Sequence, residues 1–311
     1  MLKYLIVLLS DLSPSVCHYQ NGQTKQRLIS PEILRKAVTM AMQQNLSVQV
    51  VWPNHTVPEE VKAELTRYDH INIAPVALTT DAEVLIAESV SDLLFIPNNA
   101  NVVLRLSLTE LQNEIENVET ALSKMERLNI VLTDVDKLGD KEFDLYNNLL
   151  NRLSSKVKDE YRNKHSIQVG CLTDRIMLSR MNNCNAGFEG ITLAPDGCFY
   201  VCPAFYFNGD DPIGDVEKGV CISNPQLYRL DHAPLCRNCE AYQCRRCAWL
   251  NKKITHEVNT PSHEQCVMAH IERNASMRLL ESIRELGEFM PEKKVEAIDY
   301  LDPFDKISNN I

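Results

Sequence analysis

Apolar and polar residues recur with two different periods along the first 175 residues. Short runs of aliphatic and β-branched residues predict buried strands, and longer segments with apolar residues three or four positions apart predict helices. The predicted strands are 4–9, 48–52, 71–76, 84–88, 93–96, 102–106, 130–135 and 167–172. The predicted helices are 31–44, 59–68, 108–127 and 141–162. This alternation predicts an α/β fold with a parallel sheet, either an open sheet or a degenerate partial (β/α) barrel.

Capping residues support two of these helices. Ser30 precedes Pro31, which suits an N-cap followed by a first helical residue. Thr109 is the predicted cap of the helix over 108–127.

The amino-acid composition of the chain changes near residue 175. Glycine, cysteine and aromatic residues become more frequent, and helical periodicity fades until about residue 264. A last helix is predicted over 264–286, followed by a polar tail. We therefore expect an α/β domain over 1–175, a small cysteine-rich domain with the C-terminal helix over 176–290, and a tail over 291–311.

Ten of the eleven cysteines lie in the second half of the chain, and seven of these are candidate metal ligands. Four of the seven form the run C-R-N-C-E-A-Y-Q-C-R-R-C, spaced Cx2Cx4Cx2C, two lie before this run and one lies after it. Two thiols separated by two residues can reach one metal centre from a tight turn, so this spacing predicts two metal centres. The seven predicted ligands are Cys184, Cys202, Cys236, Cys239, Cys244, Cys247 and Cys266.

The length, charge and N-terminal sequence of the chain argue against several other interpretations. Disulfide bridges are the main alternative, but a chain of 311 residues can build a core without them. The apolar run 5–9 is short and Asp11 follows it, which indicates a buried strand, not a signal peptide. A formal net charge of −10 argues against nucleic acid as the main partner. With no segment long enough to span a membrane, we expect a cytoplasmic protein.

The cysteine-rich segment resembles a SPASM domain, the C-terminal module of many radical S-adenosylmethionine enzymes that modify peptides. Matching features occur in order over about 85 residues: C-x-A-G at 184–187, G-x4-C-P at 197–203, I-G-D-V at 213–216, the cysteine run, and the last cysteine. The resemblance implies two four-iron four-sulfur clusters, with zinc as the alternative metal.

The same resemblance divides the ligands between the two clusters. It implies that Cys236, Cys239, Cys244 and Cys266 bind one cluster, and that Cys184, Cys202 and Cys247 bind the other. The family has one more cysteine shortly before C-x-A-G, and here 177–183 contain none. Cys171 or Cys198 could complete the second cluster. Otherwise one iron stays open and could accept a substrate thiolate or carboxylate.

Radical S-adenosylmethionine enzymes carry Cx3Cx2C just after their first barrel strand. Here the segment after the first strand reads S-D-L-S-P-S-V-C-H-Y-Q, and Ser13, Cys17 and Gln20 stand at the three positions. One thiolate cannot hold such a cluster. We therefore expect no radical initiation by this chain and no S-adenosylmethionine, although Cys17 could also be unrelated to the motif.

A SPASM-like module without this motif resembles the CXXX repeat peptide maturase family. The resemblance rests on the start L-L-S-D-L-S-P-S-V-C-H-Y, the segment V-V-L-R-L-S-L and the cysteine-rich end. It implies an accessory maturase for a ribosomally made, cysteine-rich precursor peptide, acting with a separate radical S-adenosylmethionine enzyme. A metal-stabilised peptide-binding scaffold without catalysis is the alternative.

Other chemistry-bearing residues form no recognisable motif. His263 and His270 could share a face of the last helix, and a solvent-facing or hydrogen-bonded pair is the simpler interpretation. Asp134 and Asp136 follow a predicted strand, where strand capping is a simpler role than catalysis.

Overall fold

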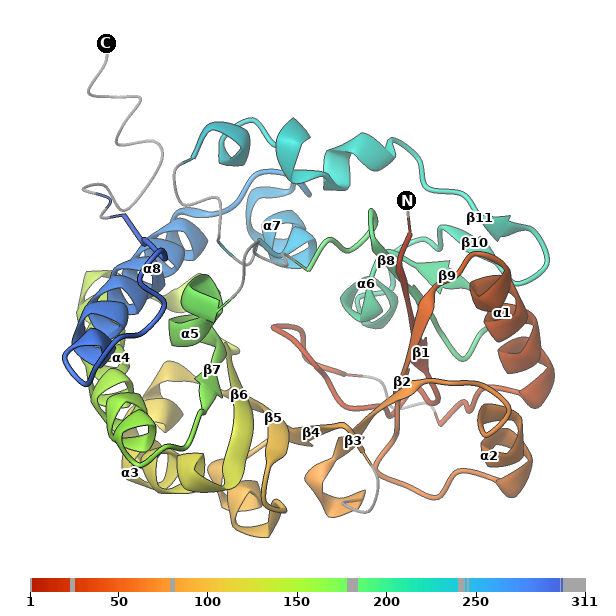
Figure 1. Ribbon diagram of the computed structural model, residues 1–311. Helices are drawn as coiled ribbons and strands as arrows, with labels where there is room; N and C mark the ends of the chain where they lie inside the picture. The colour runs from red at the N-terminus through yellow and green to blue at the C-terminus, as the bar shows by residue number, and fades with distance from the viewer. Residues whose placement is uncertain are drawn as a thin grey trace. The chain divides into compact units, whose positions relative to one another are not determined.

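The computed structural model describes residues 2–22, 26–78, 82–177, 184–239, 244, 246–296 and 298 (Figure 1). The chain forms two compact units. The first combines Met1–Ile86 with Cys184–Arg229, and the second combines Ala87–Asn183 with Leu230–Ile311. Each unit thus takes one segment from the predicted α/β domain and one from the cysteine-rich region. The predicted boundary at residue 175 stays a prediction.

The first unit is built on a mostly parallel sheet. Its strands follow the order β4-β3-β2-β1-β8-β9, and only β9 runs antiparallel to its neighbour. The strands are β1 (Tyr4–Leu8), β2 (Ser47–Val51), β3 (Ile71–Pro75), β4 (Val84–Ala87), β8 (Gly190–Leu193) and β9 (Phe199–Tyr200). The other elements are α1 (Pro31–Gln43), α2 (Glu59–Leu65), η1 (Val76–Leu78), α6 (Pro203–Phe207), the hairpin β10 (Gly214–Asp215) and β11 (Gly219–Val220), and η5 (Pro225–Tyr228).

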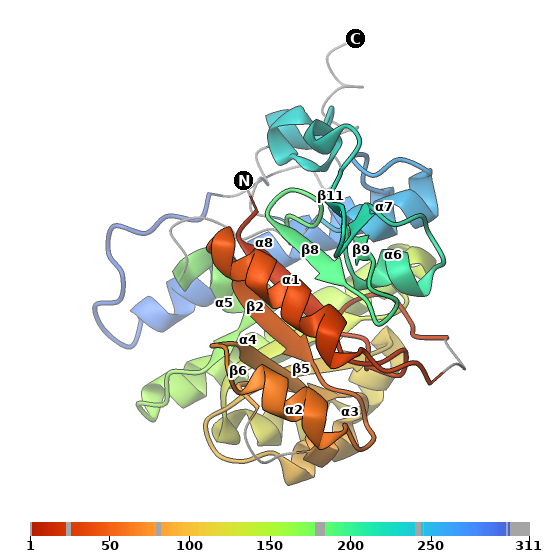
Figure 2. The same cartoon turned by 90° about the vertical axis from the view of Figure 1, so that its right-hand side faces the viewer.

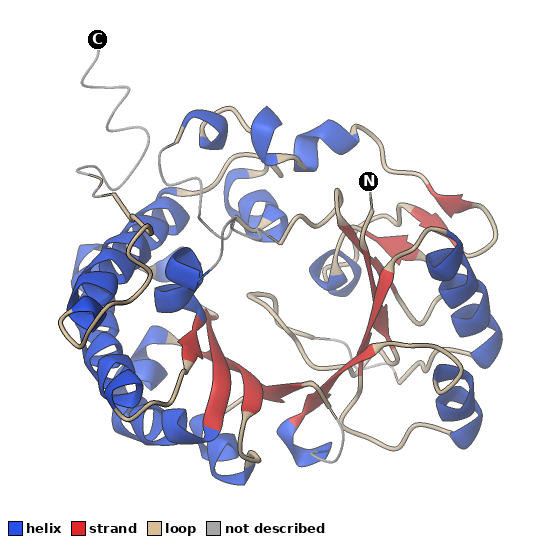
Figure 3. Cartoon of the chain, viewed as in Figure 1, coloured by secondary structure: helices blue, strands red, loops and turns tan. Residues whose placement is uncertain are grey.

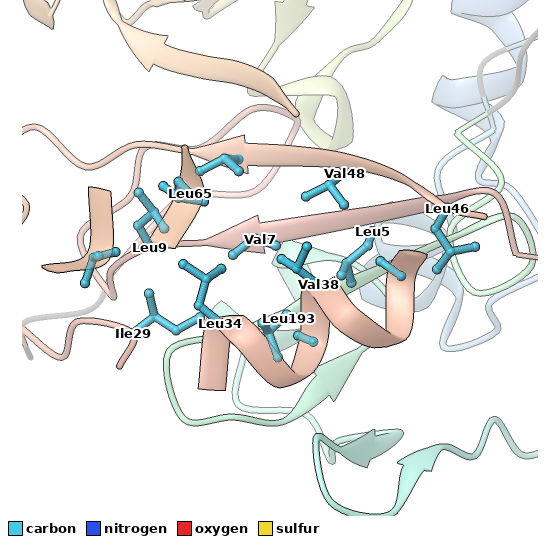
Figure 4. Close-up of a cluster of buried hydrophobic side chains, with 14 of the residues drawn as sticks. Leu5, Val7, Leu9, Ile29, Leu34, Val38, Leu46, Val48, Leu65 and Leu193 are labelled. Carbon is cyan, nitrogen blue, oxygen red and sulfur yellow. The ribbon is translucent and has the colours of Figure 1, made fainter. Parts of the chain in front are cut away.

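Helices α1 and α2 cover one face of this sheet (Figure 2). The cap of α1 is the predicted one, because the Ser30 hydroxyl accepts a hydrogen bond from Ile33 N at 3.2 Å. The apolar face of α1 contributes Leu34 and Val38 to a core that also contains Leu5 and Val48 from the strands (Figure 4). Full burial of each such side chain stabilises the fold by about 1.5–3 kcal/mol.

The two segments of the first unit meet at the centre of its sheet. Strand β1 pairs in parallel with β2 on one side and with β8 on the other. Tyr4 is in register with Gly190, and Val7 with Leu193. The residues that follow β1 and β8 are therefore held at one edge of the sheet, which positions the candidate site below.

The second unit contains a parallel sheet of β5, β6 and β7 with helices packed around it. Helices α4 and α8 run side by side, and α5 packs against α8 (Figure 3). The strands are β5 (Ala100–Leu106), β6 (Met125–Leu132) and β7 (Gln168–Val169), and the helices are α3 (Leu108–Ala121), α4 (Asp140–Arg162), α5 (Gly170–Met177), α7 (Ala248–Thr255) and α8 (His263–Arg284). Short 3-10 turns are η2 (Val90–Phe95), η3 (Leu122–Lys124), η4 (Val135–Lys137), η6 (Leu230–His232) and η7 (Cys236–Asn238).

Five local predictions were wrong. The predicted strand over 93–96 is absent, because residues 93–95 lie in η2, where Ser89 and Asp92 form a capping box that starts a turn. Helix α3 ends at Ala121, and residues 122–127 belong to η3 and β6 instead. The N-cap of α3 is Ser107, not Thr109. The predicted strand over 167–172 keeps two residues before α5 begins at Gly170. The expected loss of helix from 175 to 264 missed α6 and α7.

The α/β class with parallel strands is confirmed, whereas the SPASM-like character of the cysteine-rich region stays a prediction. Most of the predicted tail lies outside the described residues. Within the described part of the chain, every helix is too short or too polar to cross a bilayer.

Candidate functional site

The first unit contains Cys17, Cys184 and Cys202, here called the first thiol group. Charges on Cys184 and Cys17 both act on Cys202. Cys17 lies in the loop after β1, Cys184 comes shortly before β8, and Cys202 is the N-cap residue of α6. Two of the three are ligands that the sequence predicted. None of the eleven cysteines, all of which lie among the described residues, forms a disulfide.

The loop after β1 is fixed by hydrogen bonds to the ends of the strands. The hydroxyl of Ser13 donates to Val51 O at 3.0 Å and accepts from Ser10 N at 3.2 Å. The Asn21 amide donates to the carbonyls of Asp11 and Ser13 at 2.7 and 2.8 Å. Ser13 therefore has a structural role in which its side chain is fully buried. Gln20, at the third position of the degraded motif, is exposed.

The same loop is attached to α6. Tyr206 donates a short hydrogen bond to the buried Asp11 carboxylate. The rings of Tyr19 and Phe207 stack with centroids 5.4 Å apart and planes 20° apart. Since Cys17 lies two residues before Tyr19, these contacts hold the Cys17 segment against the helix that Cys202 begins.

Gly187 and Tyr228 form a close contact beside Cys184. Gly187 has a φ of +80°, and a Cβ there would lie 2.7 Å from the Tyr228 ring. Glycine is therefore required both by the left-handed backbone and by the aromatic ring. This explains in physical terms why the C-x-A-G segment ends in glycine.

The electrostatics of Cys202 reflect its two neighbouring thiols. Burial raises the pKa of Cys202 well above its ordinary value, and charge on Cys184 raises it further. The backbone N–H of Phe205 opposes this rise, and charge on Cys17 adds to it. Burial also raises the pKa of Tyr228, with a further contribution from charge on Cys202. The Tyr228 ring thus lies close to both the Cys184 turn and Cys202.

The second unit gathers Cys236, Cys239 and Cys244, here called the second thiol group. Burial raises the pKa of Cys244 to about 12, and charges on Cys236 and Cys239 contribute to the rise. Burial likewise raises the pKa of Cys236, while the charge of Arg246 opposes the rise. All three are ligands that the sequence assigned to one cluster.

A buried cation lies next to this group. Arg175 on α5 is 1% exposed, and its charge lowers the pKa of Cys244 against the effect of burial. Its guanidinium donates to Cys171 O at 3.1 Å and to the Glu272 carboxylate at 3.1 Å. A fixed positive charge of this kind stabilises thiolates that must deprotonate to bind metal.

His270 lies between the backbone carbonyl of Cys266 and the sulfur of Cys239. Cys266 and His270 lie one turn apart on α8, and both are buried. His270 Nδ1 hydrogen-bonds to Cys266 O at 2.7 Å, and its Nε2 lies 4.0 Å from Cys239 Sγ. His270 is therefore hydrogen-bonded and buried, not solvent-facing. His263, by contrast, is exposed and its ring packs on the edge of Phe143.

The remaining predicted ligand and the two alternatives have different surroundings. Cys247 is the N-cap of α7, where its sulfur accepts from Leu250 N at 3.5 Å. Cys198 sits in a hairpin turn beside Asp196 and Asp215, whose charges add to the burial that raises its pKa. Cys171 is buried on α5. The charges of Arg27 and Lys218 oppose this rise in the pKa of Cys198.

Among the described residues, no group of three or more His, Cys, Asp or Glu side chains is arranged to hold a metal ion. The metal assignments, iron–sulfur clusters and zinc alike, therefore stay predictions.

Sequence reasoning missed Tyr228 and Arg175, because neither belongs to a motif and only the fold brings each to a thiol. The carboxylates after β6 have structural roles. Asp134 accepts a hydrogen bond from Leu108 N at 3.1 Å, and Asp136 pairs with Lys253 at 2.7 Å. These contacts agree with the expectation that Asp134 and Asp136 have a structural role and not a catalytic one.

No family model matches the sequence, and no curated protein matches it. Solved structures do match its fold. A histidine-tagged form of anSMEcpe with bound AdoMet has a TM-score of 0.64 at 11% identity, covering 92% of this chain and 100% of that one. Native anSMEcpe with bound AdoMet and the Cp18Cys peptide has a TM-score of 0.62 at 11% identity, covering 91% and 100%. SuiB of Streptococcus suis bound to its precursor peptide SuiA has a TM-score of 0.46 at 11% identity, covering 84% and 75%.

The anSMEcpe structures carry AdoMet, whereas the sequence predicts that this chain uses none. That expectation stays a prediction, and it differs from what the similar anSMEcpe structures bind. At 11% identity the likeness shows the fold. The chain therefore has the fold of the anSMEcpe structures.

Proposed function

We propose that this protein takes part in the modification of a ribosomally made peptide, as an accessory to a separate radical S-adenosylmethionine enzyme. The fold it shares with anSMEcpe, whose structure includes the Cp18Cys peptide, supports a role connected with peptides. The CXXX repeat peptide, with its recurring cysteines, is the substrate class that the sequence resemblance suggests.

The observation that carries the proposal is the contrast between the loop after β1 and the two thiol groups. In the loop, Ser13 is buried in hydrogen bonds between strand ends and Gln20 is exposed, so two of three thiols of a radical-initiating cluster are missing. Outside this loop the chain keeps all seven cysteines that the sequence predicts as metal ligands. A protein that keeps auxiliary ligands and lacks the initiating ones is suited to serve a partner enzyme.

The protein's own residues would bind, orient and insulate the metal centres. Cys236, Cys239, Cys244 and Cys266 would hold one cluster, with Arg175 supplying a buried positive charge beside the thiolates. Cys184 and Cys202 would contribute to the other. When bound, four-iron clusters supply a one-electron acceptor of the kind needed when a substrate radical closes to product.

Anaerobic purification followed by iron, sulfide and zinc analysis tests the metal assignment. We expect iron and acid-labile sulfide in equal amounts and bleaching of the brown colour by dithionite. A colourless protein that contains only zinc would instead support a peptide-binding scaffold. A folded protein with no metal would refute the proposal.

Co-purification tests the accessory role. The tagged chain is expressed with a candidate radical S-adenosylmethionine enzyme and a candidate cysteine-rich peptide. We expect both to be retained on the tagged chain. Modification of the peptide by the radical enzyme alone, at an unchanged rate, would contradict an accessory function.

A further inference from the structure

Two tyrosines of the first unit donate their hydroxyl protons to separate carboxylates. Tyr200 on β9 donates to Asp196 Oδ2 at 2.8 Å, and Tyr206 on α6 donates to Asp11. Both tyrosines are buried, and Asp11 is only 1% exposed. Burial of a carboxylate costs free energy, and phenylalanine at the two ring positions would fill the core without any need for one. The two hydrogen-bonded pairs therefore exceed what packing of the core requires.

The two tyrosine rings also contact each other. Their centroids lie 5.0 Å apart and their planes meet at 61°, an edge-to-face arrangement. Pairing of β9 with β8 places Tyr200 opposite Thr192 on the sheet, and α6 holds the other ring. Both rings and both carboxylates belong to the first unit. Because the orbitals of rings in contact overlap, an electron lost from one ring can be replaced from the other.

Both phenols keep their protons at neutral pH. Burial raises the pKa of Tyr200 and of Tyr206, and the carboxylate that each hydroxyl contacts raises it further. The charge of Arg27 opposes both shifts. Loss of an electron reverses the situation, because the tyrosine radical cation is a strong acid. Its proton then passes to the carboxylate along a hydrogen bond that is already formed.

We propose that Tyr200 and Tyr206 form a redox-active pair that gives one electron to a thiyl radical on a bound peptide. The choice of oxidant rests on the proposed function, because it assumes a cysteine-rich peptide. In this step the thiyl sulfur gains one electron and becomes a thiolate. One of the two phenols becomes a neutral tyrosyl radical, and its proton moves to the carboxylate that it contacts. The total charge is the same before and after the step.

A buried tyrosine of the second unit differs from this pair in its carboxylate. Tyr146 on α4 donates to Glu272 Oε1 at 2.9 Å, but Glu272 Oε2 accepts from the buried Arg175 at 3.1 Å. A proton that moved to Glu272 would discharge a buried ion pair, which is costly. Arg27 Nε lies 4.0 Å from Asp11 and its side chain is 44% exposed, so water screens that interaction. We therefore expect Tyr146 to be harder to oxidise than the pair.

Flash photolysis of the whole, metal-free chain tests the pair without a peptide. Light, ruthenium tris-bipyridine and a cobalt(III) quencher generate a one-electron oxidant, and transient absorption and EPR detect tyrosyl radicals. The double variant Tyr200→Phe with Tyr206→Phe should lose more than half of the long-lived tyrosyl signal. Tyr146→Phe is the matched control, since it removes a buried, carboxylate-bonded hydroxyl, and it should lose little of the signal.

Asparagine variants test the proton acceptors. The amide oxygen of asparagine still accepts a hydrogen bond, but the amide does not take up the phenol proton. With Tyr200→Phe as the background, Asp11→Asn should slow formation of the Tyr206 radical at least about tenfold, as expected when a general base is removed. Matching circular dichroism and thermal melts of the variants exclude misfolding as the cause.

Pulse radiolysis tests the oxidant. A cysteine-containing peptide carrying a thiyl radical should be reduced faster by the parent chain than by the double variant. Equal rates would show that the assigned oxidant is wrong. An unchanged tyrosyl signal in the double variant, or radical formation at the parental rate after Asp11→Asn, would overturn the redox role of the pair. Neither result would affect the accessory role, which fails separately if co-purification retains no radical enzyme and no peptide.

Discussion

The Nε2 atom of His270 lies 4.0 Å from the sulfur of Cys239. The other ring nitrogen, Nδ1, must carry a proton because it hydrogen-bonds to the carbonyl of Cys266, which can only accept. The ring therefore has a fixed orientation between two predicted ligands of one cluster. Groups of this kind, which orient ligands without being assigned as ligands, commonly control metal affinity.

His270→Ala should weaken iron retention by the second thiol group. We expect about a 10–100-fold loss of affinity in competition with an iron chelator, the usual effect of removing such a neighbour. His263→Ala is the control, because His263 is exposed on the same helix. Equal iron retention by the two variants would show that His270 only fills space.

Gly187→Ala should destabilise the protein more than Gly209→Ala. Both glycines have a positive φ, +80° and +76°, so each substitution carries a backbone cost of about 1–2 kcal/mol. Only at Gly187 does the new Cβ meet a ring, at 2.7 Å from Tyr228, whereas nothing lies within 4 Å at Gly209. Urea unfolding of the metal-free protein measures the difference.

The same comparison in a Tyr228→Ala background isolates the contact. Without the ring, Gly187→Ala should cost about as much as Gly209→Ala, because only the backbone cost remains. An unchanged difference between the glycines in that background would rule out the Tyr228 contact as its source.

Arg175→Met should cost about 3–5 kcal/mol of unfolding free energy, because it leaves the Glu272 carboxylate without its buried cation. The pair is separated by 3.1 Å, and Arg175 is almost fully buried. Arg152→Ala is the control. That guanidinium pairs with Glu119 at 2.9 Å on the surface, where such a pair contributes about 0–1 kcal/mol. Similar losses in the two variants would contradict the role assigned to burial.

Alkaline pH should destabilise the metal-free protein. Burial raises the pKa of Cys202, Cys236 and Cys244 in the folded state above the ordinary thiol value of 9.0, to about 12 for Cys244. The folded state then holds more protons than the unfolded state above pH 9, so stability falls as pH rises through that range. Burial raises the pKa of Tyr200 and Tyr206 as well, which acts in the same direction.

Anaerobic urea unfolding between pH 7 and pH 10 measures this effect. Cys244→Ala should flatten the dependence because it removes one of the raised groups. Cys221→Ala, at an exposed site, should leave the slope as it is. A stability that rises with pH in the parent protein would contradict the assigned burial of these thiols.

Periodicity and capping predicted most elements of the α/β fold. Strands such as β1 and helices such as α1 carry their own signals, an apolar run in one and Ser30 before Pro31 in the other. The errors occur where a local polar contact decided the outcome. Asp92 closes a capping box on Ser89 and turns an apolar stretch into η2, an interaction that the apolar pattern does not register.

The sequence predicted only those residues of the candidate site that belong to recognisable motifs. The spacing of Cys236, Cys239 and Cys244 indicated their proximity, since they lie within a few residues of one another. The proximity of Cys17 to Cys202 depends on contacts such as the hydrogen bond from Tyr206 to Asp11, which spans 195 residues. Tyr228 and Arg175 likewise reach their thiols only through tertiary packing.

The pairing of β1 with β8 sets the order in which this molecule can be completed during synthesis. Tyr4 pairs with Gly190, so the central ladder of the first unit cannot close until both segments have left the ribosome. Strand β1 is synthesised long before β8, and until β8 emerges the edge of β1 that β8 covers has no partner from that segment. Folding of the first unit is consequently completed late in synthesis.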